Sequence, residues 1–93
     1  MSNLVQFAAE VRAARAVLGW SQTELARRTA VTQRAIHCIE QNIARPRTQT
    51  EQRIVEAFTD AGLRFERLSS GGFKMTVPTK AIAKPHPRSG RAK

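Results

Sequence analysis

The stretch SQTELARRTAVTQRAIHCIEQ, residues 21–41, has the pattern of two short helices joined by a tight turn. Ser21 is followed three residues later by Glu24, and such a pair forms the capping box that starts a helix. The next three residues after the first helix, 29–31, are expected to form the turn, and Thr32 is the expected N-cap of the second helix. The segment therefore predicts a helix-turn-helix motif.

The second helix of this motif, residues 32–41, has two different sides. Ile36, Ile39 and Glu40 recur at helical spacing on one side, which indicates a buried face. The other side carries Arg34, His37, Cys38 and Gln41. Because 16 Lys and Arg outnumber 7 Asp and Glu, for a net charge of +9, the expected partner is DNA or RNA rather than an anionic membrane surface.

The positive charge is not spread evenly along the chain. Residues 78–93 hold five Lys and Arg and no acidic residue, whereas residues 1–60 hold eight basic and six acidic residues. The segment after residue 77 is also rich in Pro, Ser, Gly and Ala, which predicts a disordered basic tail. Residues 1–60 have an excess of only two positive charges, so nucleic-acid binding by this part of the chain depends on where its charges lie.

Two further helices flank the motif. Apolar residues at helical spacing predict a first helix over residues 4–18, which Gly19 ends by adopting left-handed backbone. Thr48 and Glu51 form a second capping box, and the helix that they start is expected to end at Gly62. The chain up to this glycine is long enough for one small domain.

The pattern changes after this helical domain, residues 1–62. Apolar and polar residues alternate on both sides of Gly71-Gly72, which predicts a β-hairpin over residues 63–77. An isolated hairpin is only marginally stable in water, so its apolar side must cover the helices or pair with a second chain. The apolar residues in question are Leu63, Phe65, Phe73, Met75 and Val77. The expected fold is mainly α: four helices, a C-terminal β-hairpin and a basic tail.

Residues 11–63 resemble the lambda-repressor-like DNA-binding domain of the Cro and repressor proteins of phages and of the wider XRE family. The matching positions, counted from Gln22, are Gly19, Leu25, Ala26, Val31, Ile36, Ile39, Glu40 and the pair Arg45-Pro46. So many matches at fixed offsets are far more specific than a single short motif. Ala30 and Asn42 differ from the family, which usually has Gly at both positions. The resemblance implies a four-helix fold with a DNA-recognition helix over residues 32–41.

The first residues of the recognition helix are the expected base readers. Gln33 suits adenine N6 and N7, and Arg34 suits guanine O6 and N7, each through two hydrogen bonds. Cys38 aligns with a base-contacting position of the family, where its thiol would touch a thymine methyl group; a partly buried hydrophobe is the alternative. His37 is the fourth candidate, with phosphate contact or simple exposure to solvent as its alternatives.

A second set of residues is expected to contact DNA phosphates. Gln22 opens the first helix of the motif, where free backbone N–H groups and the helix dipole favour an anion. The resemblance adds that a Gln at this position braces the first residue of the recognition helix. The other expected phosphate contacts are Thr32, Gln41, Arg45 and Arg47.

The resemblance also implies a structural ion pair between Arg15 and Glu40. Glu40 lies on the apolar side of its helix beside Ile36 and Ile39, which is an unusual place for an isolated charge. A partly buried pair would lock the first helix to the recognition helix.

The expected function is sequence-specific binding of double-stranded DNA by a transcriptional regulator, with repression as the expected mode. One recognition helix reads few base pairs, at about 1–3 kcal/mol for each good contact, so we expect a homodimer on an inverted repeat. The hairpin is the expected dimer interface. One alternative is an antitoxin-like or co-regulator module that binds a protein partner through the hairpin. Another is general nucleic-acid binding through the tail.

Several classes of protein are not expected. One Cys and two His support neither a disulfide framework nor a zinc site, and no cofactor is expected. No set of residues has the pattern of a catalytic site, so an enzyme is not expected. The sequence also has no apolar run of membrane-spanning length. We therefore expect a cytoplasmic protein, and the resemblance implies that it is DNA-associated and of prokaryotic or phage origin.

Overall fold

Four helices and a two-stranded antiparallel hairpin make up residues 4–82, the part of the chain that this computed structural model describes. In chain order, the elements are α1 (Leu4–Leu18), α2 (Gln22–Thr29), α3 (Gln33–Glu40), α4 (Thr48–Asp60), β1 (Arg64–Arg67), β2 (Phe73–Thr76) and the 3-10 turn η1 (Thr79–Ala81). This is the mainly α architecture that the sequence predicts. None of the helices in this range is both long and apolar enough for a membrane span.

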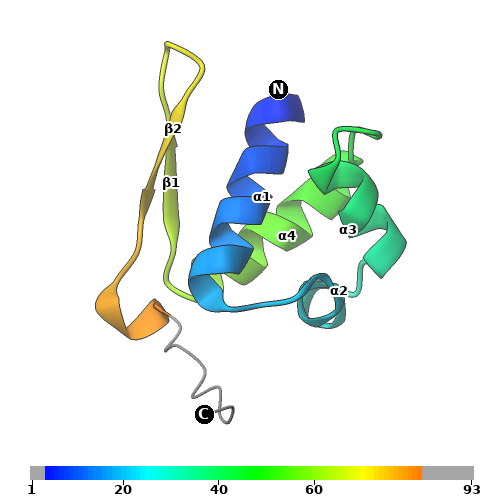
Figure 1. Ribbon diagram of the computed structural model, residues 1–93, viewed down its shortest axis with the longest axis horizontal. Helices are drawn as coiled ribbons and strands as arrows, with labels where there is room; N and C mark the ends of the chain where they lie inside the picture. The colour runs from blue at the N-terminus through cyan, green and yellow to red at the C-terminus, as the bar shows by residue number, and fades with distance from the viewer. Residues whose placement is uncertain (1–3, 83–93) are drawn as a thin grey trace, which may run out of the picture.

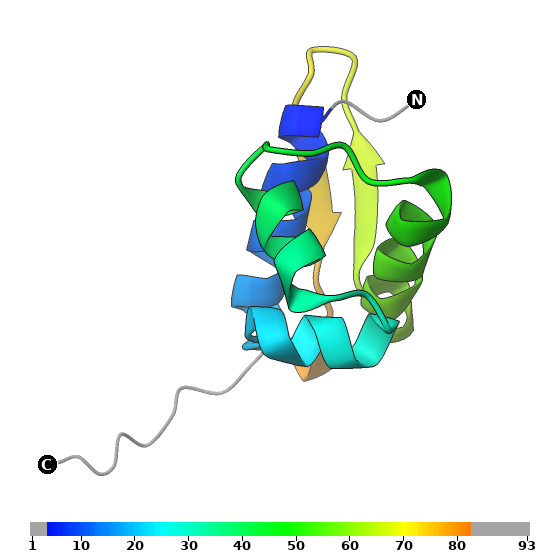
Figure 2. The ribbon, with the colours of Figure 1, turned by 90° about the vertical axis from the view of Figure 1, so that its right-hand side faces the viewer.

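The elements are arranged in three layers. The hairpin lies on one side, α1 and α4 lie in the middle, and α2 and α3 lie on the other side (Figure 1). After a turn of 90°, α2 and α3 are in front and the hairpin is behind α1 and α4 (Figure 2). Helix α3 and the hairpin are therefore on opposite sides of the molecule.

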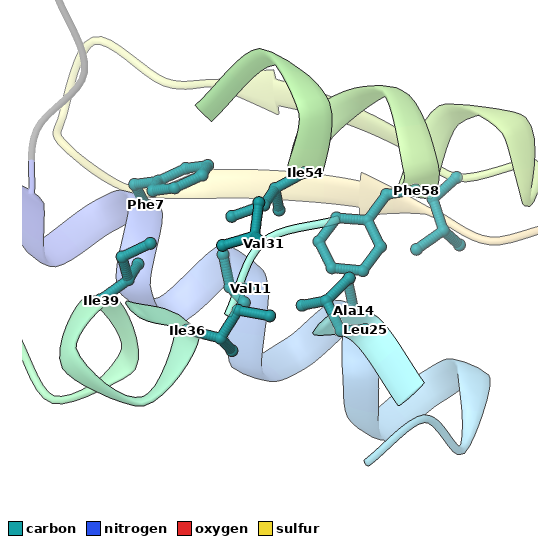
Figure 3. Packing of buried hydrophobic residues seen from close by; sticks show 10 residues of the cluster. Phe7, Val11, Ala14, Leu25, Val31, Ile36, Ile39, Ile54 and Phe58 are labelled. Atoms are coloured by element: carbon teal, nitrogen blue, oxygen red, sulfur yellow. The ribbon is translucent and has the colours of Figure 1, made fainter. Parts of the chain in front are cut away.

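The core lies between the helices and draws on all four of them (Figure 3). Its buried residues are Phe7, Val11, Ala14, Leu25, Val31, Ile36, Ile39, Ile54, Phe58 and Leu63. Ala14 is fully buried, and its small side chain allows neighbouring helices to approach closely. Since α3 places both Ile36 and Ile39 in this core, its rotation about its own axis is fixed by apolar packing.

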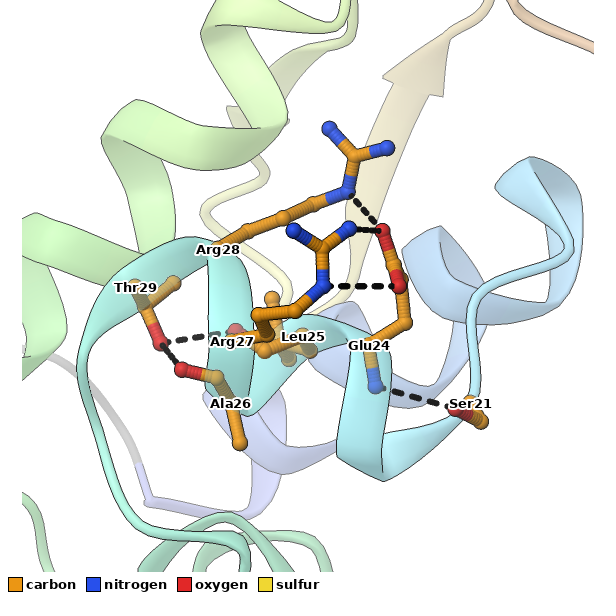
Figure 4. A network of polar contacts seen from close by, with 7 residues as sticks. All are labelled: Ser21, Glu24, Leu25, Ala26, Arg27, Arg28 and Thr29. Atoms are coloured by element: carbon orange, nitrogen blue, oxygen red, sulfur yellow. Dashed lines mark hydrogen bonds and ion pairs between the residues drawn. The ribbon is translucent and has the colours of Figure 1, made fainter.

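The two predicted N-caps of the motif are present. The Ser21 hydroxyl accepts a hydrogen bond of 2.9 Å from the backbone N–H of Glu24, and the Thr32 hydroxyl accepts one of 3.1 Å from the N–H three residues later. The carboxylate of Glu24 instead accepts hydrogen bonds from Arg27 and Arg28 (Figure 4). These two arginines thus have acidic partners on α2 itself.

The fourth helix begins at Thr48, but the predicted role of Thr48 as its N-cap is wrong. Arg47 is the N-cap of α4, with extended backbone and no side-chain cap, and its carbonyl accepts the first helical hydrogen bond, of 2.9 Å, from the N–H of Glu51. Thr48 is therefore the first helical residue and does not cap the helix.

The hairpin packs its apolar side on the helices of its own chain. Phe65 lies opposite Met75, and Arg67 lies opposite Phe73. Phe65 and Met75 are half-buried against the core. The ring of Phe65 lies 6.1 Å from that of Phe58 in α4 and 6.3 Å from that of Phe73, measured between centroids. The sequence left open whether this apolar side covers the helices or pairs with a second chain. In the structure it covers the helices.

The predicted dimer contact of Leu63 is wrong. Leu63 is only 1% exposed and belongs to the core of its own chain. Its position follows from the chain reversal at Gly62, after which the N–H of Leu63 donates to the carbonyl of Phe58 at 3.0 Å. The other residues predicted at a dimer interface are half-buried on their own chain, and their contact with a second chain stays a prediction: Phe65, Phe73, Met75 and Val77.

Two polar contacts hold the hairpin against α1. Arg67 donates two hydrogen bonds to the buried carboxylate of Glu10, at 3.0 Å and 2.8 Å. These hydrogen bonds and the negative charge of Glu10 raise the pKa of Arg67 above its ordinary value. Near the hairpin tip, Nε2 of Gln6 donates to the carbonyl oxygens of Gly71 and Gly72, both at 2.9 Å. Neither contact was predicted, because each joins residues far apart in the sequence.

The disordered basic tail was predicted to begin directly after residue 77, which is too early in the chain. Residues Thr79–Ala81 form the turn η1, and Ala81 packs against the core. The remainder of the predicted basic tail, with Lys84, Arg88, Arg91 and Lys93, lies outside the described residues.

The turn between α2 and α3 places Ala30 in left-handed backbone, with φ 58° and ψ 27°. This conformation costs an alanine about 1 kcal/mol relative to glycine. We therefore expect Ala30→Gly to raise the free energy of unfolding by about 0.5 kcal/mol, since the flexibility of glycine in the unfolded chain offsets part of the gain. Urea denaturation followed by circular dichroism measures this change.

The matched control is Ala16→Gly, at an exposed site inside α1. There the same substitution should lower the free energy of unfolding by about 1 kcal/mol. If both variants are destabilised equally, the left-handed strain at Ala30 does not affect stability.

Candidate nucleic-acid interface

Helix α3 combines a deeply buried side with an exposed side. Ile36, Ile39 and Glu40 are at most 3% exposed. Gln33 and Arg34, at the start of the helix, are both exposed to solvent, as is His37 one turn later. The structure therefore brings three of the four predicted base readers to the surface of one helix.

The buried side of α3 is held by the ion pair between Arg15 and Glu40. Arg15 of α1 donates from Nε to Oε2 at 2.6 Å and from Nη2 to Oε1 at 2.9 Å. Its third nitrogen, Nη1, donates to the carbonyl of Trp20 at 2.8 Å. Arg12 donates to the backbone carbonyl of Glu40 at 2.6 Å, so α1 holds both the side chain and the backbone of the last residue of α3.

The charge of Glu40 is stabilised despite its burial. Burial alone would raise the pKa of this carboxyl group. The hydrogen bonds from Arg15 and Gln22, together with the attraction of Arg15 and Arg12, outweigh that effect and hold the pKa of Glu40 below its ordinary value. The hydrogen bond to Glu40 also raises the pKa of Arg15. The network is therefore ionised at neutral pH, and α3 is fixed by charge-assisted hydrogen bonds.

Gln22 does not brace Gln33 as the resemblance implies. Its side chain points inward, and Nε2 donates to Oε1 of Glu40 at 3.1 Å. The partner of Gln33 is the next residue along α2, Thr23, whose hydroxyl donates to Oε1 of Gln33 at 3.0 Å. Since one N–H of the Gln22 amide is bound to Glu40, its predicted phosphate contact would use the second N–H of that amide or the backbone N–H at the start of α2.

An open groove of about 620 Å³ lies between α3, the loop that follows it and α4. Cys38 is half-buried and lines this groove together with Val31 and Ala35. Four arginines also line it: Arg34, Arg45, Arg47 and Arg53. We call this feature the arginine groove. Its apolar lining and positive charge suit a phosphate-bearing chain whose sugars contact the apolar residues.

The arginine groove includes one residue that sequence reasoning missed. Arg53 lies on α4, outside the motif and its following loop, and its side chain reaches the groove beside Arg47. Its spacing from Arg47 gave no signal in the sequence, because six residues along a helix correspond to about 600°, which places Arg53 about 120° around α4 from Arg47.

The remaining predicted phosphate contacts lie around α3. Thr32 is exposed, but its hydroxyl already caps α3. Gln41 is exposed at the C-cap, and Arg45 and Arg47 are exposed in the loop before α4. All four therefore lie close to the exposed side of α3 in the chain, and their contact with phosphates stays a prediction.

Within residues 4–82, no three His, Cys, Asp or Glu side chains gather closely enough to hold a metal ion. Comparisons of the chain with protein-family models, with curated proteins and with solved structures found no match.

Proposed function

We propose that this chain is a sequence-specific transcriptional regulator that inserts α3 into the major groove of double-stranded DNA. In this proposal, its helices have the lambda-repressor-like arrangement. The observation that carries the proposal is that α3 is anchored on one side by the buried Arg15–Glu40 pair, while Gln33 and Arg34 stand exposed at its start. A rigid helix whose first residues present bidentate hydrogen-bonding groups is what direct reading of base edges requires.

The arginine groove supports the same proposal. Arg45, Arg47 and Arg53 lie beside the exposed side of α3, where they would neutralise phosphates of the strand that borders the major groove. Phosphate contacts of this kind set the position of a recognition helix, and base contacts then set its sequence preference.

We further propose that two copies bind one operator as a homodimer. A single α3 has too few base readers for operator selection, at about 1–3 kcal/mol per good contact. Two copies would place their recognition helices about 34 Å apart on an inverted repeat. The expected contact between them is the hairpin, through its exposed strand edges and the half-buried residues near them.

Selection from a random-sequence DNA duplex library by the purified full-length chain tests the function. We expect enrichment of an inverted repeat whose half-sites are about 10 base pairs apart, one turn of the double helix. The control is the double variant Gln33→Ala/Arg34→Ala, which keeps the anchored side of α3 and should bind duplexes without enriching any motif.

The possible outcomes separate the parts of the proposal. If the wild-type chain enriches no motif, α3 does not read bases. If it enriches a single, non-repeated motif, the homodimer is wrong. If the double variant enriches the same motif as the wild type, the base readers lie elsewhere in the chain.

A further inference from the structure

The hydrogen bond between Thr23 and Gln33 joins the two helices of the motif at their exposed ends. Thr23 is the second residue of α2, and Gln33 is the first residue of α3. The hydroxyl of Thr23 donates its only hydrogen to Oε1 of Gln33, at 3.0 Å. Both residues are exposed, so this bond lies at the surface where Gln33 would meet a base.

This bond determines which end of the Gln33 amide faces outward. The carbonyl oxygen is turned toward α2, so the NH₂ group of the same planar amide is the part of the side chain that faces away from α2. Gln33 therefore presents mainly its donor to a base, and the oxygen, which has a second lone pair, is turned aside. Recognition of adenine through two bonds needs both ends of the amide at once, because the carbonyl must accept from N6 and the NH₂ must donate to N7.

We infer that Thr23 is a specificity-determining residue that makes Gln33 a reader of guanine rather than of adenine. In the major groove, guanine presents two adjacent acceptors, N7 and O6, and no donor. An NH₂ group with two hydrogens matches that edge, whereas adenine would place its own N6 donor beside it. This inference rests on the proposed function, and it replaces the adenine preference that the identity of Gln33 alone suggests.

The test compares Thr23→Val with Thr23→Ser, both as full-length chains. Valine keeps the shape of threonine but has no hydroxyl, whereas serine keeps the hydroxyl. Each chain is used to select from the duplex library, and its affinity is then measured for duplexes that carry guanine, inosine or adenine at the Gln33-dependent position. That position is the one whose preference is lost in Gln33→Ala.

We expect the wild type and Thr23→Ser to prefer guanine over adenine by about tenfold, the size of one good base contact. Inosine keeps N7 and O6, so it should bind like guanine. In Thr23→Val the amide is free to turn, and the preference should fall to about twofold or less, or reverse toward adenine. Thermal unfolding curves of the variants verify that each is folded at the assay temperature.

Two outcomes would overturn the inference while leaving the proposed function intact. The first is a wild-type preference for adenine at the Gln33-dependent position, which would mean that the amide is turned the other way. The second is an unchanged guanine preference in Thr23→Val. A wild-type chain that enriches no motif would instead overturn the proposed function, and this inference with it.

Discussion

Replacing Arg15 by alanine is expected to lower the free energy of unfolding by about 3–5 kcal/mol at neutral pH. The side chain of Glu40 is 2% exposed and that of Arg15 is 21% exposed, so the substitution leaves a buried carboxylate without its main partner. A loss of this size is a large fraction of the stability of a small domain. Urea denaturation followed by circular dichroism measures the change.

The matched control is Arg27→Ala, which removes an arginine from an ion pair at the surface. The side chain of Arg27 is 70% exposed and pairs with Glu24 within α2, so its loss should change stability little. If Arg15→Ala is no more destabilising than this control, the buried pair does not lock α1 to α3.

The effect of Arg15→Ala should also depend on pH. Because the pKa of Glu40 is lower in the folded chain than its ordinary value of 4.5, its ionisation stabilises the folded state above that pH. This contribution is lost as the pH falls through the lowered pKa. The stability difference between wild type and variant should therefore shrink in acid, and a difference that stays constant down to the acid unfolding of the wild type would contradict this account.

Replacing Arg34 by alanine is expected to weaken binding to the selected duplex by about 1–3 kcal/mol per recognition helix, and by roughly twice that for a dimer that uses both. The preference for guanine at the corresponding base pair should be lost at the same time, because no other exposed group of the first turn of α3 offers a guanidinium fork. Affinity titrations on the selected duplex and on duplexes with single base changes measure both effects.

Lys80→Ala is the matched control for this experiment. Lys80 is an exposed residue of η1, outside the strands of the hairpin, and η1 (orange) lies with the hairpin on the opposite side of the molecule from α3 (Figure 1). The variant has the same change in net charge as Arg34→Ala. Equal losses of affinity in the two variants would show that Arg34 acts through general electrostatic attraction and not through a base contact.

Features that depend on neighbouring residues could be predicted from the sequence. Ser21 and Thr32 are N-caps in the structure as predicted, because a cap bonds an N–H only three residues away. The N-cap of α4 was missed because two adjacent residues compete for the cap position. Thr48 has the better side chain, but the backbone leaves the extended conformation only after Arg47.

Features that join distant residues were harder to predict. The partner of Glu40 came from the resemblance, since nothing in the spacing of the chain identifies Arg15. The pair between Glu10 and Arg67 had one visible signal. Glu10 lies on the same stripe of α1 as Phe7 and Ala14, at helical spacing, and a carboxylate there needs a partner. Its identity depends on how the hairpin folds back, which no local pattern specifies.

The contacts of α1 make this helix a spacer of fixed length between two surfaces. Gln6 and Glu10 hold the hairpin, whereas Arg12 and Arg15 hold the end of α3. All four belong to one continuous helix, which lies between the two surfaces and is about 10 Å across with its side chains. Anything that docks on the hairpin is therefore held at a set distance and orientation from the exposed side of α3. In a dimer joined through the hairpins, this fixed spacing would set the distance between the two α3 helices. It would thereby set the separation of the two half-sites that they bind.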